Sequence, residues 1–146
     1  MLPGPPLKAI VYVSASVQPM TRDMLEALLA DARRLNLESG VTGALIYSDG
    51  MFMQYFEGAP EAADETYARI RRSRQHSRIV EMMNEPVATR EFPDWQMALA
   101  QPAASQLLAI STANWVVRHA RSMAGGPASA GMTLLRDFWR RRMHGG

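Results

Sequence analysis

One apolar run that carries a single side-chain amide constrains the fold more than any other segment of the sequence. The run Met51 to Glu57 lies between Gly50 and Gly58 and holds Gln54 among large apolar side chains. A short apolar run bounded by glycines predicts a buried strand. A buried amide needs partners for its two donors and its acceptor. We therefore expect Gln54 to face a polar partner inside the protein.

A second predicted strand near the N-terminus carries such a group. Leu7 to Ser14 is rich in β-branched residues and includes Tyr12, which has an apolar body and one polar tip. The period of two along a strand sends Tyr12 and Ser14 to one face and Val11 and Val13 to the other. Two strands that each carry one polar group predict a shared site.

The other segments alternate between helix and strand patterns. Thr21 is a good N-cap residue for a helix whose apolar side chains recur at helical spacing as far as Leu35. Ser48-Asp49-Gly50 predicts a tight hairpin between antiparallel strands. The remaining expected elements are a strand at Ala44–Tyr47, a helix at Glu61–Arg72, a strand at Arg78–Val87 and a short strand that contains Trp95, Met97 and Leu99. The order βαββαββ, with two helices on one face of a mixed sheet, predicts an α+β sandwich of the ferredoxin-like kind.

The C-terminal part is expected to be a helical extension, residues 101–146, of a domain formed by residues 1–100. Apolar stripes predict helices from Gln106 to Met123 and from Met132 to Met143, with a break between them. These helices can cover the second face of the sheet or pack on a second copy of the chain.

Charge is divided unevenly between these two parts. Residues 1–100 contain 10 basic and 13 acidic side chains, whereas residues 101–146 contain six arginines and one acid. Arginines on helices most often form a solvated face, and no base-reading motif accompanies them, so nucleic-acid binding is not expected. A nucleic-acid binder would show a steep salt dependence through Arg118, Arg121, Arg136, Arg140, Arg141 and Arg142.

Composition excludes several classes of site and protein. The absence of cysteine excludes disulfides, thiolate nucleophiles and cysteine-ligated zinc. No signal-peptide pattern occurs in Met1 to Pro6, and no 18-residue apolar stretch is present. We therefore expect a cytoplasmic protein without a membrane span.

Five short motifs follow one another along residues 7 to 100 at characteristic separations. They are Tyr12-Val13-Ser14, Asn36 six residues before Thr42-Gly43, Phe52-x-Gln54-x-x-Glu57-Gly58, Arg74-x-His76 and Trp95-x-Met97. Each motif is weak alone, but five in order are specific. Together they resemble the BLUF family of flavin-based blue-light sensors.

This resemblance implies a flavin, usually FAD and alternatively FMN, held between the two helices with its ring edge toward Tyr12 and Gln54. In the family's photocycle, the tyrosine gives an electron and a proton after blue light excites the flavin, and recombination leaves the glutamine amide rearranged. The residue types suit this chemistry, because a phenol can release an electron with its proton and an amide has a donor end and an acceptor end. No substrate is consumed, so no enzyme activity is expected.

The resemblance assigns further residues to the site. It implies flavin contacts for Ser14, Leu28, Asn36, Arg69, Ile70, Arg74, His76 and Met97. On pattern alone, Asn36 can also be a helix C-cap, a role that can coexist with flavin binding, while Arg69 is equally a solvated cation and Leu28 and Ile70 are members of the core. Trp95 and Met97 are either sheet packing or a relay from Gln54 to the C-terminal helices.

Two positions depart from the family pattern. Leu35 stands where relatives often have a polar residue, and Gln75 separates Arg74 from His76. These departures leave the choice between FAD and FMN open. They also leave open a chromophore-free interaction module built on the same fold, which would be colourless. A small flavin reductase is a third class, but the dinucleotide glycine fingerprint is missing. The preferred interpretation is a short sensor whose output is a contact with a downstream protein or a homo-oligomer.

Overall fold

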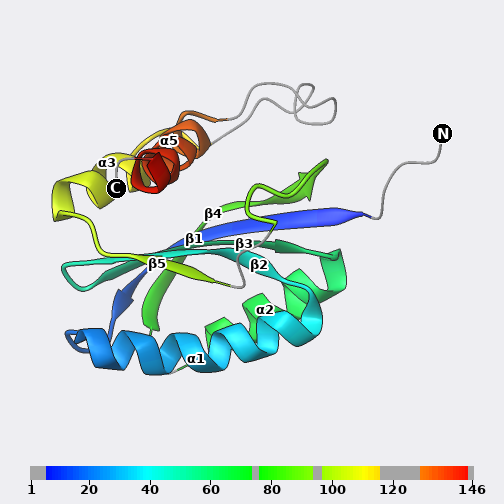
Figure 1. The fold of residues 1–146 in the computed structure, drawn as a ribbon, viewed down its shortest axis with the longest axis horizontal. Coiled ribbons are helices and arrows are strands. Elements are labelled where there is room, and N and C mark those ends of the chain that lie inside the picture. Colours follow the sequence, from blue (N-terminus) through cyan, green and yellow to red (C-terminus); the bar gives the residue numbers. More distant parts are fainter. Residues whose placement is uncertain (1–5, 74–75, 94–96, 116–128, 145–146) are drawn as a thin grey trace.

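A computed structural model describes residues 6–73, 76–93, 97–115 and 129–144, which form a sheet with helices on both faces (Figure 1). The described strands pair in the order β4-β1-β3-β2-β5. Their bounds are β1 Leu7–Ser16, β2 Thr42–Ser48, β3 Met51–Gly58, β4 His76–Val87 and β5 Ala98–Ala100. The helices are α1 Arg22–Ser39, α2 Pro60–Arg72, α3 Ala104–Ser111 and α5 Ala130–His144. The predicted α+β architecture of the ferredoxin-like kind is confirmed.

Strand pairing places the two polar residues of the predicted site opposite each other. β3 lies between β1 and β2 and is antiparallel to both. Gln54 of β3 pairs with Tyr12 of β1 on one side and with Leu45 of β2 on the other. Asp49 and Gly50 have φ angles of 48° and 78° in the predicted hairpin between β2 and β3. Positive φ at both central residues suits the twist of a tight hairpin. The centre of the sheet is therefore fixed by short connections.

Alternation along β1 distributes its side chains as predicted. Ile10 and Tyr12 belong to the apolar cluster under α1 and α2, whereas Val11 and Val13 belong to the cluster on the opposite face. The N-terminus of α1 is capped by Thr21, whose hydroxyl accepts a hydrogen bond from the Met24 amide at 3.2 Å. Both faces of the central strands are thus buried, each by a different pair of helices.

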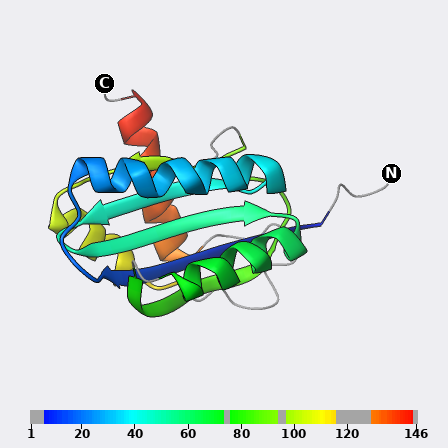
Figure 2. The ribbon, with the colours of Figure 1, turned by 90° about the horizontal axis from the view of Figure 1, so that it is seen from below.

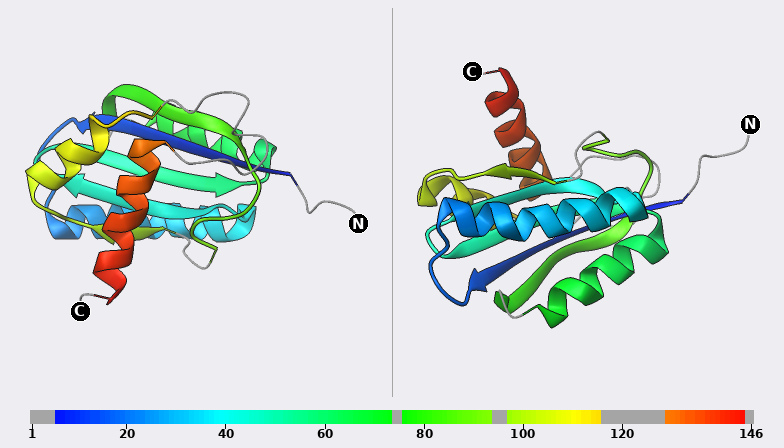
Figure 3. Two further views of the ribbon diagram at one scale, coloured as in Figure 1. Left: turned by 90° about the horizontal axis from the view of Figure 1, so that it is seen from above. Right: turned by 60° about the horizontal axis from the view of Figure 1, so that its bottom comes forward.

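The C-terminal helices cover the second face of the sheet (Figure 3). Leu107 of α3 and Leu135 and Trp139 of α5 pack in one cluster with Met53 and Tyr55 of β3. The expected cover is therefore confirmed. Within the described ranges, no helix combines the length and the apolar character that a membrane span requires.

The predicted helix from Gln106 to Met123 ends at Ser111 in α3, so the prediction is wrong for residues 112–115, and residues 116–123 lie outside the described part of the chain. The chain turns because the Thr112 hydroxyl donates to the Leu108 carbonyl at 2.7 Å and the Trp115 indole donates to the Ile110 carbonyl at 3.0 Å. The indole then lies against Gly131 of α5, where a side chain would collide with the ring. Trp115 therefore packs from a loop and not from a helical stripe.

The last predicted strand is also shorter than expected. β5 contains only Ala98 to Ala100, and Met97 immediately precedes it. Met97 and Leu99 still belong to the cluster under α1 and α2, as their alternation predicts. Trp95 lies outside the described residues. β5 pairs in parallel with β2 at the edge of the sheet.

Candidate functional site

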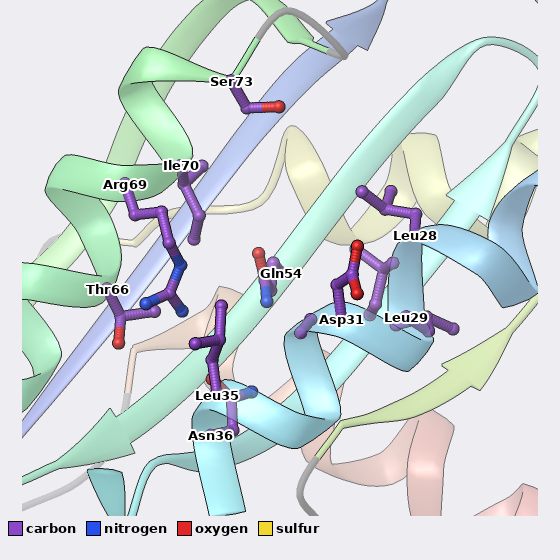
Figure 4. A pocket seen from close by; sticks show the side chains of 12 residues that line it. Leu28, Leu29, Asp31, Leu35, Asn36, Gln54, Thr66, Arg69, Ile70 and Ser73 are labelled. Carbon is purple, nitrogen blue, oxygen red and sulfur yellow. The ribbon is translucent and has the colours of Figure 1, made fainter. Parts of the chain in front are cut away.

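Helices α1 and α2 lie side by side over one face of the sheet (Figure 2). A cavity of about 280 Å³ lies between these two helices (Figure 4). Its apolar lining comes from Leu28, Leu29, Ala32, Leu35, Leu45 and Ile70. Its polar lining comes from Asp31, Asn36, Gln54, Thr66, Arg69 and Ser73. A mainly apolar cavity with a few placed polar groups is the usual form of a small-molecule site.

Gln54 contributes the amide of β3 to this cavity. Its side chain is buried, and both ends of the amide have partners. Oε1 accepts a hydrogen bond from the Tyr12 hydroxyl, and Nε2 donates to the Met97 sulfur at 3.3 Å. The structure therefore brings Tyr12 and Gln54 together, as the sequence predicts. Tyr12 and Met97 do not line the cavity themselves. Each of them bonds to Gln54, which does line it.

Tyr12 lies in an aromatic environment without solvent exposure. Its ring stacks on Tyr67 with centroids 6.0 Å apart and meets Phe56 edge to face at 6.3 Å. Burial raises the pKa of the Tyr12 phenol above its ordinary value, and the neighbouring Tyr67 raises it further. The phenol therefore keeps its proton at neutral pH and stays a hydrogen-bond donor to Gln54.

Asn36 lies inside α1 and faces the cavity with only 1% of its surface exposed. The alternative that its side chain caps the helix is wrong, because α1 continues to Ser39 and ends at Gly40 with φ of 77°. The backbone carbonyl of Asn36 accepts the closing hydrogen bonds from Gly40 and Val41 at 2.9 and 3.1 Å. The backbone of Asn36 thus takes part in closing the helix, while its side-chain amide faces the cavity.

Residues from the two helices line the cavity from opposite sides. Figure 4 shows Arg69 and Ile70 of α2 on one side of Gln54 and Leu28 and Asp31 of α1 on the other. The alternative that Arg69 is only a solvated cation is weakened, because its side chain lines the cavity and is half-buried. Leu28 and Ile70 form opposed apolar walls of the site. Asp31 and Arg69 add one negative and one positive charge.

Four other predicted residues are Ser14, Arg74, His76 and Trp95. Ser14 is buried on β1, two residues beyond Tyr12 on the same face. His76 is the first residue of β4. Arg74 and Trp95 lie outside the described residues. Their expected roles stay predictions.

Several lining residues and one buried carboxylate were not predicted from the sequence. Asp31 and Thr66 sit on the helix faces that turn toward Gln54, and Ser73 is the residue that follows α2. Helical spacing from Leu28 and Arg69 could have found Asp31 and Thr66. Glu57 was noted only as part of a motif. Its carboxylate is fully buried on β3, three residues after Gln54.

Glu57 connects β3 to the segment that follows β4. Its Oε1 accepts hydrogen bonds from the Tyr55 hydroxyl and the Glu91 amide, both at 2.8 Å, and Oε2 accepts one from the Phe92 amide at 2.7 Å. Burial raises the pKa of the Glu57 carboxyl, and these donors limit the rise. Glu91 in turn forms a two-point ion pair with Arg136 of α5, at 2.5 and 3.1 Å. The network thus joins the strand that carries Gln54 to the C-terminal helix.

Comparison with known proteins identifies the class that this fold and cavity define. The family model described as "Sensors of blue-light using FAD" matches residues 7–98. That range covers more than half of the chain, and the chain therefore belongs to the BLUF family.

Curated relatives are far longer than this chain. "Photoactivated adenylate cyclase subunit beta" of Euglena longa is 33% identical over 95 residues, which are 64% of this chain and 11% of the relative. The corresponding subunit of Euglena gracilis is 32% identical over the same share. The chain thus spans about a tenth of the length of these relatives.

Solved structures include relatives of similar size. "BlrB - a BLUF protein, dark state structure" has a TM-score of 0.64 and 29% identity, covering 73% of this chain and 80% of that one. "BlsA photo-activated state" has a TM-score of 0.61 and 25% identity, covering 70% and 74%. A structure of Klebsiella pneumoniae BlrP1 "with FMN and cyclic diGMP" has a TM-score of 0.60 and 30% identity, covering 65% and 26%. FAD and FMN are both cofactors of this family.

The residues of the cavity fit a flavin ring. A flat ring system with apolar faces matches the opposed walls of Leu28 and Ile70, and its polar edge matches the amides of Asn36 and Gln54. The volume of about 280 Å³ lies near the lower end of ligand pockets, which range from about 300 to 1,000 Å³. It suits the ring, while a phosphate-bearing tail would extend past the cavity.

Proposed function

We propose that this chain is a blue-light sensor in which Leu28, Asn36, Arg69 and Ile70 hold the flavin and Gln54 is the switch. The observation that carries the proposal is the row of hydrogen bonds from Tyr12 through Gln54 to Met97 at a cavity that fits the ring. Ser14, Arg74 and His76 are proposed as additional flavin contacts on the resemblance of their motifs, and Trp95 as part of the relay.

Tyr12 is the proposed electron and proton donor. Bound flavin supplies the absorption of blue light and, while excited, the capacity to take an electron from a nearby donor. The Tyr12 phenol is neutral because burial raises its pKa, so loss of its electron is accompanied by loss of its proton. Gln54 Oε1 already accepts a hydrogen bond from that hydroxyl and is therefore the group positioned to receive the proton.

Gln54 stores the result because its amide has two distinct ends. In the structure the acceptor end faces Tyr12 and the donor end faces Met97. Return of the electron and proton to Tyr12 with the amide turned over, or in its tautomeric form, leaves a different hydrogen-bond pattern at the cavity. A two-state hydrogen bond of this kind can bias a mobile element of the fold.

Met97 is the proposed first receiver of that change. A turned amide would place Oε1 in front of the Met97 sulfur. The thioether would then lose the hydrogen bond that it now accepts from Gln54 Nε2. Met97 immediately precedes β5, so its displacement would act on β5 and on the chain that leads to α3. The output proposed here is a contact with a downstream protein or a second copy, shifted in population by light, and not catalysis by this chain.

The proposal is tested by absorption spectra of FAD-loaded variants before, during and after blue illumination. We expect Tyr12→Phe and Gln54→Leu to keep bound flavin and to lose the reversible light-induced shift of the flavin band. Tyr47→Phe is the matched control, because Tyr47 is a buried tyrosine on the same sheet face whose hydroxyl accepts from the Met20 amide at 2.9 Å. That variant should keep the shift.

Two results would contradict the proposal. A shift of wild-type size in Gln54→Leu would remove this amide from the switch. Protein that stays colourless after reconstitution with FAD and with FMN would favour the chromophore-free interaction module.

A further inference from the structure

β5 is a short edge strand whose position needs support beyond its own pairing. It makes three residue pairs with β2, from Ala44 with Ala98 to Ile46 with Ala100. The residue before it, Met97, accepts a hydrogen bond from Gln54 through its sulfur. A strand of three residues has few backbone hydrogen bonds to hold its register. Side chains that fix its ends therefore matter for the contact between the sulfur and the amide.

Arg33 and Arg22 of α1 fix the two ends of this strand. Arg33 Nε donates to the Met97 carbonyl at 2.9 Å, at the start of β5. Arg22 Nη1 donates to Gln101 Oε1 at 2.9 Å, immediately after its end. Hydrogen bonds from a guanidinium are charge-assisted and directional, which makes them effective in setting position.

Glu26 orients both arginines. Its Oε1 lies 3.5 Å from Arg22 Nε, and its Oε2 lies 3.5 Å from Arg33 Nη1. Positions 22, 26 and 33 are four and seven residues apart, a spacing that places them on one face of a helix. α1 therefore presents a row of basic, acidic and basic side chains along β5. We call these three residues the α1 clamp.

The clamp and the switch meet at Met97. Its carbonyl is held by Arg33, and its sulfur accepts from Gln54 Nε2 at 3.3 Å. The helix that supplies the clamp also lines the cavity through Leu28 and Asn36. The helix that forms one cavity wall therefore also holds the backbone of the residue that contacts the Gln54 amide.

We propose that Arg33 is a positioning residue, which through the Met97 carbonyl holds the Met97 sulfur against the Gln54 amide and thereby sets the lifetime of the lit state. This inference rests on the proposed light switch at Gln54. Arg22 and Glu26 assist by fixing the far end of β5 and by orienting Arg33.

A purely stabilising role does not account for the clamp. The side chains of Arg22, Glu26 and Arg33 are 68%, 45% and 40% exposed. Ion pairs this exposed contribute little to the free energy of unfolding, because water screens them and ordering long side chains costs entropy. Their contacts are nevertheless directed at both ends of one short strand. The arrangement serves the placement of β5.

The test compares Arg33→Met with Arg34→Met in the full chain loaded with FAD. Arg34 is the matched control, since it is the next residue of α1, is 64% exposed and pairs with Asp31 at 3.7 Å. Without the clamp, the dark contact between Met97 and Gln54 re-forms less readily. We expect Arg33→Met to slow the dark return of the flavin band about fivefold, the factor that corresponds to one ordinary hydrogen bond. Arg34→Met should return at the wild-type rate.

Two further variants separate positioning from general damage. Arg33→Lys keeps a cationic donor of similar reach and should restore most of the wild-type rate. In a Met97→Ala background, Arg33→Met should cause no additional change, because the sulfur through which it acts is gone. Wild-type rates in Arg33→Met, or an undiminished effect of Arg33→Met in the Met97→Ala background, would overturn the proposal. Loss of flavin binding in Arg33→Met would also overturn it, by assigning Arg33 to the cavity wall.

Amide hydrogen exchange of the flavin-free chain gives an independent readout. We expect Leu99 and Ala100 to exchange faster in Arg33→Met than in Arg34→Met, because the start of β5 is released. Equal exchange in the two variants would contradict the clamp. If the wild-type chain showed no light-induced shift at all, the switch at Gln54 would fail, while this comparison would still decide whether Arg33 holds β5.

Discussion

The two faces of the sheet differ in how the space between the sheet and the covering helices is filled. Under α1 and α2 a cavity remains, with Gln54 and Asn36 at its surface. Under α3 and α5 the space is filled by aromatic rings, with Tyr55 against Phe92 at 5.2 Å and Phe92 against Trp139 at 6.2 Å. The first face is built to hold a ligand, and the second is built as a packed core.

One strand serves both faces. Gln54 of β3 points to the cavity, and its neighbours Met53 and Tyr55 point into the core under α5. The strand alternation thus places a switch and a structural contact on adjacent residues. A substitution on the cavity face should change the light response, and one on the core face should change stability. Four predictions test this separation, from the largest expected effect to the smallest.

The largest effect is expected for Leu135→Ala on the core face. Leu135 of α5 is 1% exposed, and removing a buried leucine side chain costs about 3 kcal/mol of unfolding free energy. The neighbouring Leu134, 41% exposed, is the matched control, and Leu134→Ala should cost less than about 0.5 kcal/mol. Denaturant unfolding measures both. A lost light shift in folded Leu135→Ala would break the separation of the two faces.

Glu57→Gln should cost about 2 kcal/mol at pH 5, because the amide group of glutamine brings a donor toward the Phe92 and Glu91 amides. Glu65→Gln on the exposed side of α2 is the control and should leave stability unchanged within about 0.5 kcal/mol. Denaturant unfolding at pH 5 compares the two variants. Equal stabilities would show that the Glu57 network does not stabilise the fold.

The cost of Glu57→Gln should also depend on pH. Burial raises the pKa of Glu57 above its ordinary value of 4.5, so the folded chain holds this proton more tightly than the unfolded chain. The stability that results is complete below pH 4.5 and is lost as pH rises through the raised value. The glutamine variant has no such proton, so the difference between wild type and variant should shrink from pH 5 to pH 8. A difference that grows would mean that the hydrogen-bond donors outweigh burial.

Arg136→Ala should cost about 1 kcal/mol, because Arg136 holds Glu91 in a two-point ion pair that is about one-third exposed on the arginine side. Arg140→Ala, an exposed arginine one turn further along α5, should leave the unfolding free energy nearly unchanged. Thermal unfolding of both variants at low and high salt checks this. If Arg136→Ala lowered stability only at low salt, the ion pair with Glu91 would act as an ordinary screened surface pair.

The smallest effect concerns two buried phenols on opposite faces of the sheet, Tyr12 under α1 and α2 and Tyr55 under α3 and α5. Burial raises the pKa of Tyr12 and of Tyr55 above 10.0, and the carboxylate of Glu57 raises that of Tyr55 further. At pH 11 the folded chain should therefore show less phenolate absorbance than the unfolded chain, and stability should fall as pH rises beyond 10.0. Tyr12→Phe should reduce this deficit by about half, one phenol of the pair being gone. A full complement of phenolate in the folded chain would contradict the burial of both rings.

Sequence patterns predicted the elements whose determinants are local. The alternation in β1 and the hairpin at Asp49 follow from periods and turn residues within a few positions. The contact between Tyr12 and Gln54 spans 42 residues and was predicted from the single polar group that each strand carries. The helix predicted from Gln106 ends earlier than predicted, at Ser111, because the residues that follow pack on another helix. Trp115 packs on Gly131 of another helix, and no local breaker marks that position.

The site could be predicted only where a motif or a helical face pointed to it. Leu28, Asn36, Gln54, Arg69 and Ile70 were predicted and line one cavity. The contacts of Glu57 with Glu91 and of Arg33 with Met97 span 34 and 64 residues. A pairing over that distance depends on the folded arrangement and leaves no periodic signal in the chain. These remote contacts are the ones that connect the cavity to β5 and to α5.

The most direct test of the light switch is the absorption spectrum of the full chain loaded with FAD, recorded in the dark, under blue light and after a return to darkness. We expect a shifted flavin band under light, without bleaching, that returns completely in the dark. A band that does not move under light, or that bleaches without shifting, would contradict a switch built on Tyr12 and Gln54.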